Sequence, residues 1–403
     1  MIAATAMCAA AATEAAAQDG SIVLNNQLQL GDVIAGQTLD VVDVTEQVTV
    51  TNAAQGNALS GAVQGGSLEL TSTQTMSGDA RATTTLTLGG DTSGPVNAVT
   101  QARGNYLAAG VYGADLTLDA TQVVNGSEIS AATTITGDDA RLLGGAYVDA
   151  GAFGNTVAVG AEGSHIQRSV DQRSSALIRA TNFAVTQYIP AEAEFTTQAL
   201  ANAVAVTGQN ASSQDLAVTQ RSTGSLVEAD VSANAGNAWD LAGRANAGGN
   251  QAILANQGGS LVTRTDQTND AYVRAAAIVT AFDYGALTGQ ARGVGNEVQA
   301  GNNDLHVQID NSQLNTGGVD VSAGVSGGNG YDIAVGADAA GNVVTGYACA
   351  ECEAVLIATN HQTNQGDVTA TANATVSGSS RSVIAGANAV GNSATFYVSR
   401  PGH

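Results

Sequence analysis

An asparagine recurs through most of the chain at nearly constant intervals of about 48 residues. A glycine comes directly before it in most cases, as in Gly104-Asn105 and Gly249-Asn250. The recurring asparagines are Asn57, Asn105, Asn155, Asn202, Asn250, Asn296, Asn342 and Asn392. A fixed period of this length is typical of repeat architectures, in which each unit buries its apolar surface against its neighbours.

A glutamine follows each of the first seven asparagines. The separation is 17 residues in five units, 18 in one and 20 in the last. These glutamines are Gln74, Gln122, Gln172, Gln220, Gln267, Gln313 and Gln362. Amide side chains at equivalent positions of stacked strands bond to one another, so the two series predict two amide ladders. We interpret both ladders as structural rather than catalytic, cofactor-binding or metal-binding.

The second unit shows the local pattern. Short stretches rich in Val, Ile and Thr are separated by turn residues at Gly113-Ala114, Asn125-Gly126 and 137–139. About four strands fit in one unit, which indicates two coils of about 24 residues. The sequence therefore predicts an all-β fold, a β-solenoid (β-helix) rod of about seven 48-residue repeats, each about two coils. About fourteen coils stacked about 4.8 Å apart would give a rod roughly 65 Å long.

The repeat also predicts the domain organisation. We expect a signal peptide remnant over 1–17, an irregular N-terminal cap over 18–56, the repetitive solenoid over 57–391 and a C-terminal cap over 392–403. Alternatively, either end is an assembly edge that pairs with another molecule. No later stretch approaches 18 apolar residues, so we expect an exported chain without a transmembrane helix.

Composition limits the size of the side chains in the core and the kinds of partner that the surface can bind. Gly accounts for 49 of 403 residues and aromatic residues for only 4%, so the interior must be thin and built from small side chains. The chain has 35 acidic and 13 basic residues and a net charge of −22, and all of its basic residues are arginine. A surface of this sign repels nucleic acid and anionic lipid, which disfavours both as partners.

The residues that could support catalysis are scattered. The histidines have neither metal-ligand nor catalytic-triad spacing; they are His165, His306, His361 and His403. Gly-rich stretches such as 327–330 lack the lysine and the strand–helix context of a phosphate loop, and we interpret them as turns. Trp239 is the only tryptophan, whereas a polysaccharide-cleaving β-helix would require an aromatic-lined cleft with paired carboxylates or basic residues. We therefore predict no enzymatic activity, no cofactor and no bound metal.

Cys349 and Cys352 form a CxxC pair near the C-terminus. In an oxidising compartment such a pair can close a small disulfide that fixes the local loop. A zinc half-site and an intermolecular link remain as alternatives. The βαβ context of a redox-active CxxC motif is absent from the pattern.

The asparagine and glutamine series within Gly- and Ala-rich β repeats resemble the curlin-type repeats of bacterial functional amyloid. The acidic, lysine-free chain of 403 residues more closely resembles the holdfast attachment protein D family of stalked alphaproteobacteria. That resemblance implies a holdfast anchor whose partners are an adhesive exopolysaccharide, other anchor proteins including a small amyloid-like one, and a curli-type outer-membrane secretion lipoprotein. It also implies a location at the cell surface, associated with the outer membrane.

These observations lead to one principal functional hypothesis and two alternatives. The principal one is a non-enzymatic surface protein that anchors an adhesive polysaccharide, the holdfast, to the outer membrane. The first alternative is a self-assembling, curli-like functional amyloid subunit, and the second is a polysaccharide-active β-helix enzyme. Polymer formation by the purified chain distinguishes the first alternative, and new reducing ends in treated polysaccharide distinguish the second.

Overall fold

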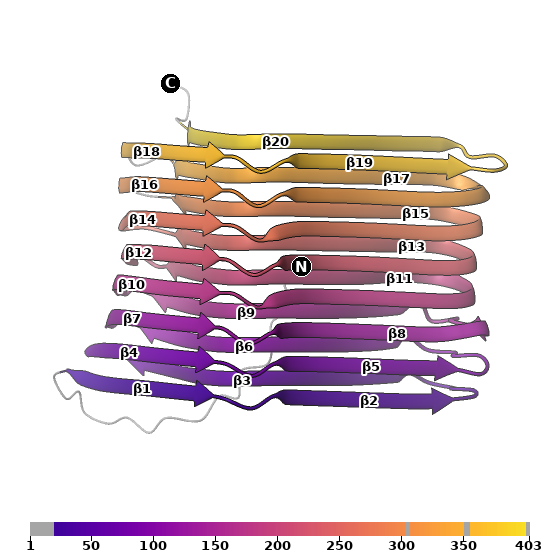
Figure 1. Cartoon of the computed structure of the whole chain (residues 1–403), viewed down its shortest axis with the longest axis horizontal. Helices are drawn as coiled ribbons and strands as arrows, with labels where there is room; N and C mark the ends of the chain where they lie inside the picture. The colour runs from indigo at the N-terminus through magenta and orange to yellow at the C-terminus, as the bar shows by residue number, and fades with distance from the viewer. Residues whose placement is uncertain (1–19, 304–305, 350–354, 400–403) are drawn as a thin grey trace.

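The computed structural model describes residues 20–303, 306–349 and 355–399. These residues form strands joined by turns and bends, and all of the strand pairings among them are parallel. The chain winds through eight flattened coils, each lying directly on the one before it (Figure 1). The all-β solenoid expected from the repeat is therefore confirmed.

Each coil has three segments in two layers, as the second coil shows. Strands β4 (Ser67–Met76) and β5 (Ala80–Leu88) follow one another in the same direction and form the front layer. Strand β6 (Val96–Tyr112) returns behind them as the back layer (Figure 1). Glycines in the left-handed region, such as Gly113 with φ of 54°, form the turn from the back layer into the next coil.

The same three segments recur along the stack. The first segments are β1 (Ser21–Gln29), β4, β7 (Asp115–Val124), β10 (His165–Ser174), β12 (Ser213–Ser222), β14 (Ser260–Asn269), β16 (His306–Asn315) and β18 (Val355–Asn364). Separate second segments are β2 (Val33–Val41), β5, β8 (Glu128–Arg141) and β19 (Val368–Val376). Separate third segments are β3 (Val48–Gln64), β6, β9 (Ala146–Glu162) and β20 (Ser382–Ser399). In coils 4 to 7 the second and third segments are continuous in β11 (Leu177–Gln209), β13 (Leu226–Asn256), β15 (Tyr272–Asn302) and β17 (Val319–Cys349).

The expectation of two coils in each repeat was wrong, because one 48-residue repeat makes one coil. Gln172 pairs with Gln122 on one side and Gln220 on the other, so residues 50 and 48 positions apart are neighbours. The error came from Asn125-Gly126, which has the composition of a reversing turn. Here these residues join β7 to β8 without a change of direction (Figure 1).

The overall shape differs from the predicted rod for the same reason. The front layer of one coil spans about 21 residues, or ~70 Å at 3.3 Å per residue. Eight coils spaced about 4.8 Å apart give a stack of only ~34 Å. The longest axis therefore lies along the strands rather than along the stack (Figure 1).

The boundaries of the solenoid also differ from the expected ones. Strands β1, β2 and β3 pair in register with β4, β5 and β6, so residues 21–64 form an ordinary first coil rather than an irregular cap. At the other end, β20 continues its pairing with β17 through Ser399, across the expected boundary at residue 392. The expected signal segment over 1–17 lies outside the described residues. Apolar residues extend into both terminal coils because these coils use the same inward positions as the others.

The interior consists of alternating inward side chains. In β7, for example, Leu116, Leu118 and Ala120 are buried while the residues between them face outward. The buried residues form two apolar clusters, one between β5-type strands and the start of the back layer, the other between β4-type strands and its end. The predicted amide residues lie between these clusters and divide the interior in two.

Candidate functional site: an aromatic groove at the layer edge

The eight repeating asparagines form one continuous ladder on the back strands. Each Nδ2 donates to the Oδ1 of the asparagine in the next coil, at 2.7–2.8 Å, from Asn57 through to Asn392. The second N–H donates to a backbone carbonyl of the front layer in the following coil, as from Asn202 to Arg221 at 3.0 Å. The ladder therefore connects coils to one another and the back layer to the front layer.

The glutamines form a second ladder on the front strands. Each Nε2 donates to the Oε1 of the glutamine in the preceding coil, from Gln362 down to Gln74, and Gln74 donates to Gln27 at 2.7 Å. The second N–H donates to a carbonyl of the back strand, as from Gln220 to Gln251 at 2.9 Å. Gln27 belongs to the ladder but falls before the first repeating asparagine, which is why the asparagine–glutamine spacing did not identify it.

A glycine comes before seven of the eight ladder asparagines, the exception being Ala201, and it allows adjacent coils to approach closely. A Cβ on Gly249 would lie 2.2 Å from Asn269 Oδ1 and 2.6 Å from the carbonyl oxygen of Gly295. Asn269 begins a shorter third ladder, in which it donates to Asn315 and Asn315 donates to Asn364. This ladder could not be recognised from the repeat, because the equivalent positions in earlier coils hold Ser222 and Ser174.

The other residues singled out in the sequence do not form a cluster. His165, His306 and His361 lie on β10, β16 and β18, while His403 lies outside the described residues. Within the described ranges, no group of three or more His, Cys, Asp or Glu side chains is placed to bind a metal ion. Cys349 is half-buried at the end of β17, and its expected partner Cys352 lies outside the described residues. The described part of the chain also contains no helix that is long and apolar enough to span a membrane.

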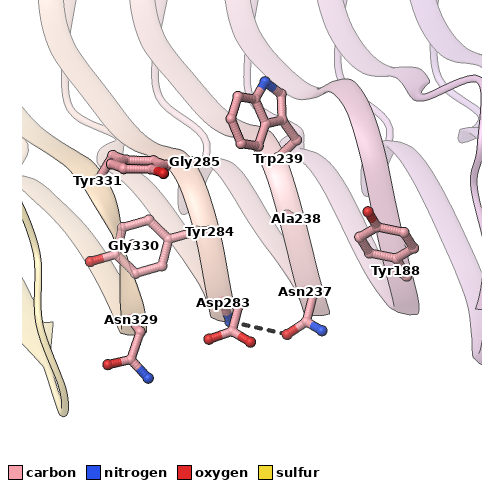
Figure 2. Close-up of a pocket in the computed structure, with 10 residues that line it drawn as sticks. All are labelled: Tyr188, Asn237, Ala238, Trp239, Asp283, Tyr284, Gly285, Asn329, Gly330 and Tyr331. Atoms are coloured by element: carbon pink, nitrogen blue, oxygen red, sulfur yellow. Dashed lines mark hydrogen bonds between the residues drawn. The ribbon is translucent and has the colours of Figure 1, made fainter.

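A groove of about 610 Å³ lies at the edge where the front layer bends into the back layer in coils 4 to 7. Its aromatic residues come from four successive coils and four different strands (Figure 2). They are Tyr188 on β11, Trp239 on β13, Tyr284 on β15 and Tyr331 on β17. Trp239 and Tyr331 are 59% and 51% exposed, whereas Tyr284 is 4% exposed and belongs to the core. Tyr188 is 38% exposed, so the groove combines one buried ring with three rings that solvent can reach.

Glycines in adjacent coils make room for these rings. A Cβ on Gly285 would lie 3.1 Å from the indole ring of Trp239 and 2.4 Å from the Trp239 carbonyl oxygen. A Cβ on Gly330 would lie 2.3 Å from the Tyr284 ring. Trp239 and Tyr331, two coils apart, meet edge to face across Gly285 with their centroids 6.2 Å apart. The alternation of aromatic residue and glycine is what places these large side chains on a stack of coils only about 4.8 Å apart.

A column of polar side chains follows the rings. Asn237, Asp283 and Asn329 pair in register in three successive coils. Asn237 Oδ1 accepts a 3.1 Å hydrogen bond from the Asp283 backbone N–H (Figure 2), and Asn329 Oδ1 accepts one of 3.3 Å from Ser379 N–H. Among the described residues, the Asp283 carboxylate forms no ion pair. The amide N–H groups of both asparagines and this carboxylate are therefore available to a ligand.

A cation borders one end of the groove. The Arg381 guanidinium lies 5.3 Å from the Tyr331 ring centroid and forms an ion pair with Asp332. The guanidinium is attracted to the face of the Tyr331 ring, and at an exposed site such a contact contributes about 0.5–1 kcal/mol.

The groove has the chemistry of a saccharide site. A pyranose ring presents apolar C–H groups on its faces, which suit exposed indole and phenol rings, and hydroxyls at its rim, which suit amide and carboxylate partners. The groove was not identified from the sequence, because residues 327–330 were interpreted as turns, whereas they lie within β17, and Trp239 was treated as isolated. A signal was present, because Gly-Asn-Ala-Trp-Asp at 236–240 and Gly-Asn-Gly-Tyr-Asp at 328–332 share one pattern two coils apart.

The fold and the groove together define a class: a repetitive, acidic β-solenoid with an aromatic groove on its outer edge. A protein-family model, described as holdfast attachment protein D, matches residues 42–318. That match covers more than half of the chain, so the protein belongs to the holdfast attachment protein D family. The matched region includes Tyr188, Trp239 and Asp283 but ends before Tyr331. Neither the curated proteins nor the solved structures include a match to the chain.

Proposed function

We propose that this chain is a non-enzymatic surface protein that anchors an adhesive polysaccharide, the holdfast, to the outer membrane. The single observation that carries the proposal is the aromatic groove, in which Trp239 and Tyr331 are exposed beside an amide and carboxylate column. Membership of the holdfast attachment protein D family supports the attachment role. In this proposal the sugar rings stack on Trp239 and Tyr331 and the asparagine amides bind their hydroxyls.

The charge of the chain narrows the class of saccharide. With a net charge of −22 and Asp283 inside the groove, the surface repels carboxylated or sulfated polymers. The proposed ligand is therefore a neutral or amine-bearing polysaccharide. A pull-down that compares a neutral polymer with polygalacturonate tests this preference.

The proposal extends to export and to partners. We propose that the chain reaches the cell surface through an outer-membrane secretion lipoprotein and acts there with other anchor proteins. The family resemblance supports both partners. Co-purification of the tagged chain from outer-membrane fractions tests this part separately from saccharide binding.

Deletion of the gene in the source organism tests the anchoring role. Cells and spent medium are then stained with a lectin specific for the adhesive polysaccharide. The proposal predicts normal synthesis with the polysaccharide shed into the medium. Polysaccharide retained by the deletion strain at wild-type levels would contradict an anchoring role. New reducing ends after incubation of the pure protein with the polysaccharide would contradict its non-enzymatic part.

A further inference from the structure

The two ends of the stack are open sheet edges. At the first coil, strands β1 and β2 have no neighbouring strand beneath them among the described residues, and β18, β19 and β20 have none above. Inward apolar side chains at both ends, such as Val33 and Val368, are only partly buried. Open parallel edges over exposed core residues are normally capped or paired with another chain.

The two amide ladders run in opposite directions, which gives each end a distinct hydrogen-bonding character. Asparagine Nδ2 groups donate toward the last coil, so Asn392 ends its ladder with a donor and Asn57 begins it with an acceptor. Glutamine Nε2 groups donate toward the first coil, so Gln27 ends that ladder with a donor and Gln362 with an acceptor. In the described chain, Gln362 Oε1 accepts only a 3.3 Å bond from Asn360 in its own coil.

We propose that a second copy of this chain stacks its first coil on the last coil of this one, head to tail. Asn392 then donates to Asn57 of the second copy, and Gln27 of the second copy donates to Gln362. Both ladders continue across the junction with unchanged direction. The reverse arrangement, last coil on last coil, would set donor against donor in the asparagine ladder.

The apolar columns match across the same junction. Following the pairing register from coil to coil places Val33 of the second copy over Val368, and its Leu39 over Ala374. These residues are the partly buried members of one core cluster at its two ends. Stacking a second copy would bury them by the same contacts that join coils inside the chain.

An outward column supplies an independent argument. Its members from first coil to last are Ile22, Glu69, Thr117, Gln167, Asp215, Val262, Gln308 and Ile357. Isoleucine occupies both terminal coils of this otherwise mostly polar column, with Ile22 66% and Ile357 50% exposed. Head-to-tail stacking places Ile22 of the second copy directly over Ile357, so that the two exposed side chains cover one another.

Such a contact joins different surfaces of identical chains and does not close on itself, so it forms an open filament. Each copy would add eight coils, or about 38 Å. The groove lies on coils 4 to 7, away from both ends, so this inference does not depend on saccharide binding. If the groove does bind saccharide, a filament presents one groove per copy and raises the avidity for a long polymer.

Charge substitutions at the outward column test the register. In the full chain, Ile22→Asp combined with Ile357→Asp opposes two carboxylates across the junction. Ile22→Arg combined with Ile357→Asp replaces them with an attractive pair. Thr117→Asp is the control, because it adds one aspartate to the same column in coil 3, away from both ends. All three positions are solvent-facing, and circular dichroism checks that each variant folds.

Sedimentation and electron microscopy over a range of concentrations measure assembly. We expect the wild type and Thr117→Asp to form filaments at similar protein concentrations. The double-aspartate variant should need a concentration at least about tenfold higher, because its two carboxylates repel each other. The arginine–aspartate variant should recover assembly and lose it in high salt. A wild-type chain that stays monomeric at all concentrations, or a double-aspartate variant that assembles as well as wild type, would overturn the proposal.

Discussion

The amide ladders and the aromatic groove are both built from residues at equivalent positions of successive coils, but they differ in composition and exposure. The columns of the two long ladders hold the same residue in every coil, and their central members, such as Asn202 and Gln220, are completely buried. The column beside the groove contains Tyr188, Asn237, Asp283 and Asn329, and the nearby rings of Trp239 and Tyr331 are exposed.

This difference indicates that the ladders stabilise the fold, whereas the groove is suited to ligand recognition. A hydrogen-bonded ladder requires an identical amide in each coil, because each side chain must accept from one neighbour and donate to the other. A ligand site requires different groups around one ligand, so its residues change from coil to coil. We therefore expect substitutions in the ladders to affect unfolding, and substitutions in the groove to affect binding.

The largest effect is expected for Asn202→Ala. This change leaves two buried amide groups without ladder partners, because Asn155 loses its acceptor and Asn250 loses its donor, and it also removes the part-buried hydrogen bond to the Arg221 carbonyl. At 1–3 kcal/mol for each orphaned group, the free energy of unfolding should fall by about 3 kcal/mol or more. Denaturant unfolding measures it, with the exposed Asn303→Ala as control. Equal stability of the two variants would contradict a stabilising ladder.

The next effect is expected for Gly249→Ala. The new methyl group would lie 2.6 Å from the Gly295 carbonyl oxygen, so the adjacent coil must move. Overpacking of this kind costs about 1–3 kcal/mol. The chain offers its own control, because Ala201 occupies the equivalent position in coil 4. Ala201→Gly should change the free energy of unfolding much less, and a loss as large as that of Gly249→Ala would show that close approach is not the cause.

Trp239→Ala tests the expectation that substitutions in the groove affect binding rather than stability. Trp239 is exposed and its ring is not part of the core, so unfolding should change by no more than about 0.5 kcal/mol. Loss of one stacking platform should weaken saccharide binding by about tenfold. Binding of the purified polysaccharide measures it, with Phe183→Ala as the control, an exposed aromatic residue that does not line the groove. Equal saccharide binding by both variants would show that Trp239 does not belong to the binding site.

The smallest effect is expected for Glu297→Gln and depends on pH. Burial alone would raise the pKa of Glu297, but hydrogen bonds and charge from Arg292, with the amides of Gln251 and Gln299, outweigh it and hold the pKa below its usual value. The ionised form therefore stabilises the fold above the unfolded pKa, and this contribution disappears as pH falls through the folded pKa.

The corresponding measurement is unfolding of both proteins across pH. At pH 7 the wild type should be more stable than Glu297→Gln by only about 1 kcal/mol, because Arg292 is partly exposed and solvent screens the pair, and the difference should shrink as pH falls below 4.5. The effect of Asn202→Ala should not change over this range, because the ladders are uncharged. A difference for Glu297→Gln that is independent of pH would contradict the role of its charge.

The sequence identified the features that repeat without change. Asn57 to Asn392 recur because the ladder needs an amide in every coil, whereas the family resemblance rested on composition and repeat style. The number of coils was wrong because turn composition at Asn125-Gly126 does not show whether the chain reverses there. The groove was missed because its aromatic residues alternate with glycine, so no single residue type recurs at one position.

The most direct measurement tests in cells whether the groove is needed to anchor the polysaccharide. The deletion strain is complemented with the wild type, with Trp239→Ala/Tyr331→Ala or with Phe183→Ala, and surface levels of each protein are matched by immunoblot. We predict that only the groove variant sheds lectin-stained polysaccharide into the medium. If the groove variant holds the polysaccharide as firmly as wild type at equal surface level, the groove is not the attachment site.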